Sequence, residues 1–154
     1  LPFEDNSIDV ATALDVVEHV EDHKKAVEEM YRVLKPGGIA VITVPAHMWL
    51  WSYHDVSLHH HRRYSGGELR SLLSGVGPVA FFSPIHTAIL PVVTAVRVLK
   101  KIVSKNKEHE SDVRESGELV NAGMGIIYAF ERMLLRLFGK LPFGTSYLAV
   151  IKKP

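Results

Sequence analysis

The sequence predicts an α/β fold, on three features of its first 44 residues. Residues 8–14 and residues 39–44 are apolar stretches typical of strands that are buried on both faces. Residues 23–34 lie between them and follow the spacing of an amphipathic helix. A strand, a helix and a strand with short connections are typical of a βαβ unit. The two strands should therefore be parallel, with helices on both sides of the sheet.

The first helix should begin after Asp22, whose side chain can cap it. Its apolar residues are spaced to form one buried stripe, and they are Val27, Met30, Tyr31 and Leu34. Pro36 and the glycines that follow it should end the helix.

The rest of the chain predicts two further strands and two further helices. Residues 45–64 read as a loop rich in aromatic residues and histidine. Ser65 and Glu68 have the spacing of a capping box, which predicts a helix from there to about Gly75. Residues 79–82 and 147–151 are expected strands, and residues 122–138 an amphipathic helix.

Composition sets limits on the kind of protein. A chain of 154 residues fits one domain, and its net charge of +1 gives no overall field for nucleic acid, so no nucleic-acid partner is predicted. The absence of cysteine excludes disulfides, a thiol nucleophile and a Cys-ligated zinc. Leu1 opens directly into fold-like sequence without a signal peptide, so we expect a cytoplasmic protein. The oligomeric state stays open.

Three motifs resemble those of the class I S-adenosylmethionine-dependent methyltransferases of types 11 and 12. They are the acidic-aromatic lead-in at residues 1–9, the Glu18-His19 pair, and the Leu-Lys-Pro-Gly-Gly turn at residues 34–38. The resemblance implies a Rossmann-like fold that supplies strands four to seven, with the last strand antiparallel between the fifth and sixth. It also implies one incomplete domain over residues 1–154, with a helical insertion at residues 85–140.

The family's cofactor loop has no counterpart here, since the sequence contains no Gly-x-Gly motif. We therefore expect a piece of a longer product, or a chain that begins mid-domain, with the edge of the strand at residues 8–14 exposed. Alone, it should be inactive and should tend to pair through that edge. The alternative is a non-catalytic, methyltransferase-like scaffold or interaction module. A nicotinamide-dependent reductase is a weaker alternative, because its fingerprint is missing.

The first group of candidate site residues follows the first strand. In an open parallel sheet, ligands bind at the carboxyl ends of the strands. The resemblance implies that Leu14, Asp15 and Val16 contact the methionine part of S-adenosylmethionine, chiefly through their backbone. Alternatively, the Asp15 carboxylate caps a turn or a helix.

Glu18 and His19 form a titratable pair directly after a buried strand, which favours a position facing a cleft. His19 could act as a general base, or it could fix the loop by bonding to backbone. The order Asp15-x-x-Glu18-His19 also resembles a pattern with which some methyltransferase subfamilies hold a divalent metal together with a distant histidine. Those subfamilies usually have Glu at the first position, and Asp15 is shorter, so no metal is predicted.

The second group lies in the loop after residue 44. It resembles elements of a bacterial and archaeal methyltransferase subgroup, which implies a substrate-binding loop on the ligand side of the sheet. Trp49, Trp51 and Tyr64 could form an aromatic wall, and Arg62 or Arg63 could bind a carboxylate or phosphate.

His54 or His61 could be the base on a nucleophile awaiting methylation. Three adjacent histidines also suggest zinc, but neighbouring side chains point in different directions and rarely meet at one metal. The alternative for the whole loop is a hydrogen-bonded lid.

The implied function is methyl transfer from S-adenosylmethionine to a small-molecule acceptor. The apolar stretches at residues 86–104 and 122–138 should be core helices of an inserted cap, which favours a fairly hydrophobic acceptor. An interfacial helix at a membrane surface is the less favoured interpretation. The motifs do not distinguish oxygen, nitrogen and carbon nucleophiles.

Overall fold

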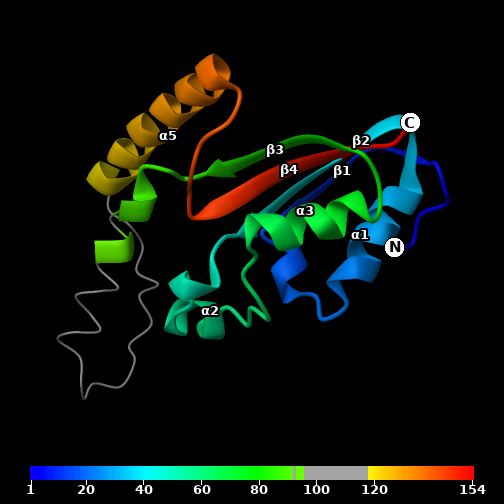
Figure 1. Ribbon diagram of the computed structural model, residues 1–154, viewed down its shortest axis with the longest axis horizontal. Coiled ribbons are helices and arrows are strands. Elements are labelled where there is room, and N and C mark those ends of the chain that lie inside the picture. The colour runs from blue at the N-terminus through cyan, green and yellow to red at the C-terminus, as the bar shows by residue number, and fades with distance from the viewer. Residues whose placement is uncertain (92, 96–117) are drawn as a thin grey trace.

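The computed structural model describes residues 1–91, 93–95 and 118–154, and its four strands form one mixed sheet (Figure 1). In sequence order the strands are β1 (Ile8–Leu14), β2 (Leu34–Pro45), β3 (Val79–Ile85) and β4 (Ser146–Lys152). Their order across the sheet is β1-β2-β4-β3. β1 and β2 are parallel, and β4 runs antiparallel to both of its neighbours. The predicted α/β fold, with its last strand inserted antiparallel, is confirmed.

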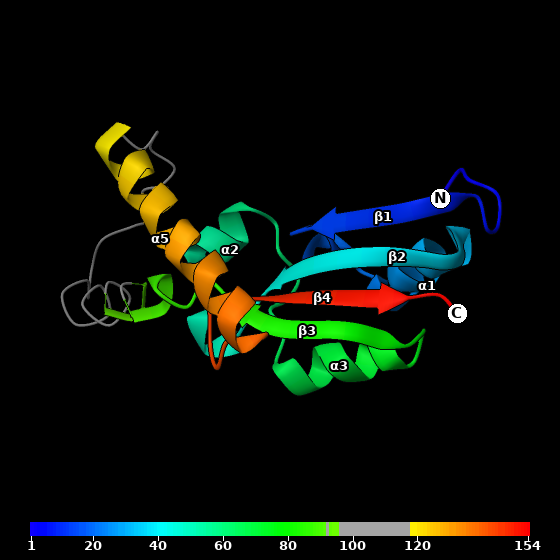
Figure 2. The ribbon, with the colours of Figure 1, turned by 90° about the horizontal axis from the view of Figure 1, so that it is seen from above.

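Two helices, α1 (His23–Val33) and α3 (Gly66–Ser74), lie on the same face of the sheet (Figures 1 and 2). The core forms between them and the strands, where Val27, Leu69 and Leu73 pack with alternate residues of β2 and β4. The opposite face is only partly covered by described residues. Val10 and Leu14 of β1 are 54% and 57% exposed. The prediction of helices on both faces is therefore wrong for the part of the chain that the structure describes.

The start of α1 agrees with the sequence prediction, and its end does not. Asp22 Oδ1 accepts a hydrogen bond from the backbone N–H of Lys25, 3.0 Å away. The helix ends at Val33, and the next residue already pairs with β1. Pro36 and the two glycines after it therefore lie inside β2, where the register shifts. A Cβ on Gly38 would lie 3.0 Å from the carbonyl oxygen of Asp9, so the close approach of the strands requires glycine.

The segment between β2 and α3 contains more structure than the predicted loop. It forms the short helices η2 (Met48–Leu50) and α2 (Tyr53–Ser57), and a further turn, η1 (Val17–His19), follows β1. The capping box of α3 is confirmed: Glu68 N–H donates to Ser65 Oγ at 3.2 Å, and Ser65 N–H donates to Glu68 Oε2 at 2.8 Å.

The helix α5 (Glu118–Phe138) extends beyond one end of the sheet (Figure 2). Its predicted buried stripe is largely exposed, with Ile126 and Leu137 at 73% and 69%. Ile127 and Leu134 of the same stripe are half-buried, so the helix is only partly covered, and its role as part of an inserted cap stays a prediction. Among the α5 residues whose burial is described, Glu131 is the buried one, and its carboxylate accepts hydrogen bonds from the backbone N–H groups of His86 and Thr87.

The first predicted cap segment, residues 86–104, lies mostly outside the described residues. Among the helices that are described, none combines the length and apolar character needed to cross a membrane.

Candidate functional site

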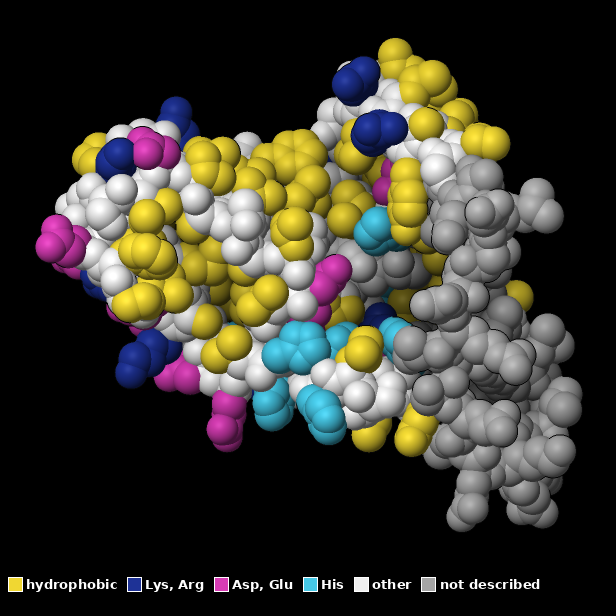
Figure 3. All heavy atoms as spheres, turned by 180° about the vertical axis from the view of Figure 1, so that it is seen from behind, with side chains coloured by type: hydrophobic (Ala, Val, Ile, Leu, Met, Phe, Trp, Pro, Cys, Tyr) yellow, Lys and Arg dark blue, Asp and Glu magenta, His cyan; other side chains and the backbone are white. Residues whose placement is uncertain are grey.

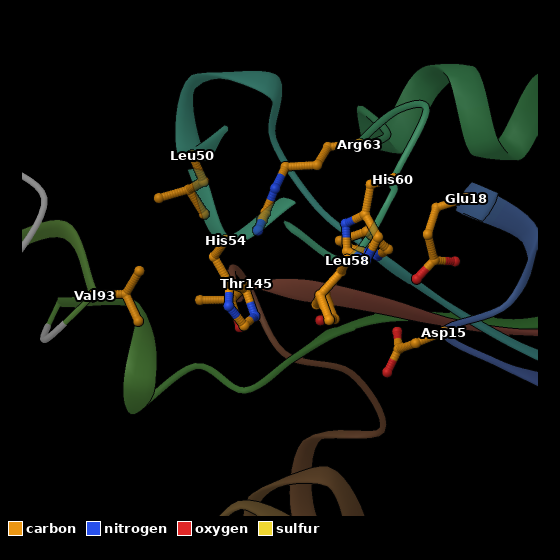
Figure 4. Close-up of a pocket in the computed structure, with 11 residues that line it drawn as sticks. Asp15, Glu18, Leu50, His54, Leu58, His60, Arg63, Val93 and Thr145 are labelled. Carbon is orange, nitrogen blue, oxygen red and sulfur yellow. The ribbon is translucent and has the colours of Figure 1, made fainter. Parts of the chain in front are cut away.

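A pocket of about 300 Å³ lies at the carboxyl ends of the two parallel strands (Figure 4). Asp15, directly after β1, and Pro45, the last residue of β2, both line it. The remaining walls come from the segment between β2 and α3, from Glu18, and from the chain around Thr145. The two strand ends thus open into one cavity, at the edge of the sheet where open parallel sheets bind their ligands.

Asp15 turns the chain at the end of β1. Its backbone is left-handed, with φ at 52°, and its N–H donates to the carbonyl oxygen and the hydroxyl of Thr43, at 3.1 and 3.0 Å. Leu14 and Val16 beside it are 57% and 49% exposed. The next helical turn, η1, is preceded by Val16 and has no side-chain cap. The capping alternative for Asp15 is therefore not supported at η1.

Glu18 is fully buried at the pocket wall. Within the described part of the chain, neither of its carboxylate oxygens has a hydrogen-bond partner. Burial raises the pKa of Glu18 to about 7, and the nearby charge of Asp15 acts in the same direction. A carboxyl group with this pKa can gain or lose a proton near neutral pH.

His60 and Asp55 form a hydrogen-bonded pair at the same wall. The Nδ1 atom of His60 lies 3.0 Å from Asp55 Oδ1, which also accepts a hydrogen bond from Arg63 Nε at 2.6 Å. Burial lowers the pKa of His60, although the Asp55 carboxylate opposes this effect. Burial alone would raise the pKa of Asp55, but the hydrogen bond and charge of Arg63 bring it below its ordinary value.

His60 is the site residue that the sequence did not single out. Its signals in the sequence were the run of three adjacent histidines and the aspartate five residues earlier, at a spacing that a short helix followed by a turn can bring together. In the structure, its ring meets the ring of His19 edge to face, with 4.7 Å between the centroids. Figure 3 shows several histidine side chains gathered on this side of the molecule, beside acidic ones.

The predicted bases occupy different places. His54 lines the pocket together with Asp15, as Figure 4 shows. His19 and His61 are exposed and are not among its lining residues. The backbone N–H of His61 donates instead to the carbonyl oxygen of Glu18, at 2.9 Å.

The predicted substrate-binding residues lie around the pocket rather than in its walls. Trp49 is 58% exposed, and Trp51 is half-buried. Arg62 Nη2 donates to the carbonyl oxygen of Glu21 at 2.9 Å. Tyr64 is buried, with its hydroxyl 2.7 Å from Nδ1 of His23. Their role in binding a substrate stays a prediction.

The fold is of the Rossmann-like methyltransferase type. The chain resembles solved structures of a Thermotoga maritima S-adenosylmethionine-dependent methyltransferase and of Haemonchus contortus phosphoethanolamine N-methyltransferase 2, each with a TM-score of 0.54. The first is 19% identical, with 100% of this chain and 60% of that one covered. The second is 17% identical, with 99% and 34% covered. The cyclase SpnF has a similar fold, with a TM-score of 0.54 at 18% identity over 100% of this chain and 52% of that one.

Part of the sequence is similar to known methyltransferases. Residues 1–42 match the family model described as a methyltransferase domain. A protein of Mycolicibacterium smegmatis named as an S-adenosylmethionine-dependent methyltransferase is 35% identical over 79 residues, which are 50% of this chain and 31% of that protein. An uncharacterised methyltransferase of Mycobacterium sp. strain JLS is 40% identical over 67 residues, 44% of this chain and 25% of that protein. These matches support a relation to the class I S-adenosylmethionine-dependent methyltransferases, and the matched segments span less than a third of the length of these two relatives.

Proposed function

We propose that the whole protein containing this chain transfers the methyl group of S-adenosylmethionine to a small, fairly hydrophobic acceptor. The observation that carries the proposal is the meeting of Asp15 and Pro45, the ends of two parallel strands, at one pocket. The family match supports the use of this cofactor, and the similar phosphoethanolamine N-methyltransferase is a complex with S-adenosylmethionine.

The pocket fits part of the cofactor. Its volume of about 300 Å³ is at the lower limit of small-molecule sites, and no glycine-rich phosphate-type loop occurs in the sequence. We assign the methionine portion to Leu14, Asp15 and Val16, where the left-handed turn at Asp15 leaves the strand end exposed. When bound, the cofactor supplies an electrophilic methyl group. Other parts of the whole protein would hold its remaining groups.

His54 is the predicted base best placed to act, because it shares the pocket with Asp15. It would accept a proton from an oxygen or nitrogen nucleophile as that atom attacks the methyl group. The apolar walls at Leu50 and Leu58 would exclude water and align the acceptor, which lowers the barrier without further chemistry.

A non-catalytic scaffold is the second candidate, and one observation favours it. β1 is an edge strand of the sheet, and a groove of about 540 Å³ with apolar walls lies against it and α1. Such a face can pair with further strands of the same protein or with a partner chain. We favour the same protein, since the matched relatives are more than three times as long as the matched segments. The fold alone does not decide, because one fold supports many functions.

Calorimetric titration of the full-length protein with S-adenosylmethionine tests the proposal. We expect binding with a Kd in the range of about 1–100 μM, and none to the isolated chain of 154 residues. His54→Gln should leave cofactor binding unchanged and lower methyl transfer by about 100-fold. His59→Asn, at an exposed neighbouring histidine, is the matched control. No cofactor binding by the full-length protein would favour the scaffold.

A further inference from the structure

Two side chains outside the predicted catalytic set, Glu18 and His60, converge beside the pocket with His19, which is one of the predicted bases. Glu18, His19 and His60 each offer one ligand atom, and these atoms all lie within 4.8 Å of one another. Two of them come from η1 after β1, and the third comes from the segment between α2 and α3. We propose that they bind a divalent transition-metal ion.

Glu18 is the first reason for this assignment. Its carboxylate is completely buried, and in the described structure neither oxygen accepts a hydrogen bond. An unpaired buried carboxylate is costly, and proteins rarely keep one without a function. A bound cation would compensate the charge and satisfy an oxygen at the same time.

The orientation of His60 is the second reason. Its Nδ1 atom is taken by Asp55 at 3.0 Å, so Nε2 is the nitrogen left for a ligand. Asp55 is itself fixed by Arg63 Nε at 2.6 Å and by the backbone N–H of Ser52 at 2.9 Å. Metal-binding histidines commonly donate their other ring N–H to a carboxylate held in this way.

The donor set selects the kind of metal. Two imidazoles and one carboxylate suit Zn²⁺ and similar ions, whereas Mg²⁺ and Ca²⁺ prefer oxygen donors alone. Tetrahedral ligation at about 2.1 Å places donors about 3.4 Å apart, so small side-chain rotations would complete the site. The sequence predicted no metal because Asp15, at the first position of the pattern, is shorter than the usual Glu. Asp15 lies outside the trio, and His60 supplies the histidine donor from a distant part of the chain.

The open coordination positions would face the pocket, because Glu18 and His60 both line it. If the proposed methyl transfer is correct, the ion would bind an oxygen of the acceptor there. The metal site itself does not depend on that reaction, because it rests on the geometry of the three side chains.

Calorimetry with Zn²⁺ on untagged, chelator-treated full-length protein tests the site. We expect a Kd below about 1 μM, with no comparable binding of Mg²⁺. Glu18→Gln and His60→Ala should each weaken Zn²⁺ binding at least about 100-fold, and Asp55→Asn about 10- to 100-fold. His59→Asn, next to the ligand but exposed, should bind Zn²⁺ like the wild type.

Circular dichroism establishes that each variant is folded, and Glu18→Gln should fold at least as well as the wild type because it removes a buried charge. Wild-type protein that binds no Zn²⁺, or a folded Glu18→Gln variant with unchanged affinity, would overturn the metal site. S-adenosylmethionine binding, measured on the same samples, separates this result from failure of the proposed function.

Discussion

Arg63 Nε lies 2.6 Å from Asp55 Oδ1, and both side chains are buried. The ion pair joins α2 to the chain just before α3, and Arg63 also donates from Nη1 to the carbonyl oxygen of Ala46 at 3.1 Å. Since Asp55 also holds His60, one buried carboxylate fixes two residues of the pocket wall, His60 and Arg63.

Removing one partner of this pair should be strongly destabilising. Asp55→Ala leaves the Arg63 guanidinium buried without its counter-charge, which costs about 3–5 kcal/mol. Denaturant unfolding of the full-length protein measures the change. The exposed acid Glu21 is the control, and Glu21→Ala should change the free energy of unfolding by less than about 0.5 kcal/mol. A loss below 1 kcal/mol for Asp55→Ala would contradict the expected role.

The capping box of α3 should make stability depend on pH. Its hydrogen bonds with Ser65 lower the pKa of Glu68 below its ordinary value of 4.5. The stabilisation is therefore present above about pH 4.5 and is lost as the pH falls through the lowered pKa. Glu68→Ala should cost about 1 kcal/mol at pH 7 and little at pH 2.

Thermal unfolding of the wild type and of Glu68→Ala from pH 2 to pH 7 checks this prediction. The difference in stability between the two proteins should disappear at the acidic end. Glu68→Gln is the matched variant, since it keeps the cap but cannot titrate. A wild-type advantage over Glu68→Ala that persists at pH 2 would contradict the assignment.

Gly144 should tolerate no side chain. A Cβ built on it overlaps the backbone of Ile85 at the end of β3, which is rigid because it pairs with β4. Gly144→Ala should therefore cost about 2–3 kcal/mol. Gly125 in α5 has open space around it, and Gly125→Ala should raise stability by up to about 1 kcal/mol. The midpoint of urea unfolding should fall for Gly144→Ala and rise for Gly125→Ala. Equal shifts in the two variants would contradict the close contact between Gly144 and the backbone of Ile85.

Asp15 should contribute to stability and to cofactor binding through its backbone conformation. With φ at 52°, a β-branched residue is strained there, so Asp15→Val should destabilise by about 1–2 kcal/mol. Asp15→Gly should be nearly neutral and should keep affinity for S-adenosylmethionine within about threefold, because the proposed contacts come from the main chain. Calorimetry on both variants checks this, and a large loss of affinity in Asp15→Gly would assign the contact to the carboxylate.

The elements that the sequence predicted well are those set by local rules. Asp22 and Ser65 begin helices as expected, because a cap depends on a few neighbouring residues. The strand order was predicted from the family resemblance, and the structure reproduces it. The failures involve long-range contacts. The apolar stripe of α5 has the periodicity of a buried helix, but periodicity does not show whether a partner surface exists.

The candidate site was only partly predictable for the same reason. Asp15 and His54 line the pocket as their positions after strands led us to expect, whereas Leu14 and Val16 are not among its lining residues. His60 depends on Asp55 and Arg63, which meet it only after α2 has folded back on the chain. A run of three histidines gives no indication of which ring will point inward.

The position of β4 has a consequence for how the protein is made. β3 has no contact with β2 in the sheet and is joined to it only through residues 146–152. On the ribosome, β1, α1 and β2 can assemble early, while β3 and α3 must wait until more than sixty further residues have been translated. A nascent chain stalled before β4 would expose two unpaired strand edges to chaperones, so production of this protein should be sensitive to C-terminal truncation.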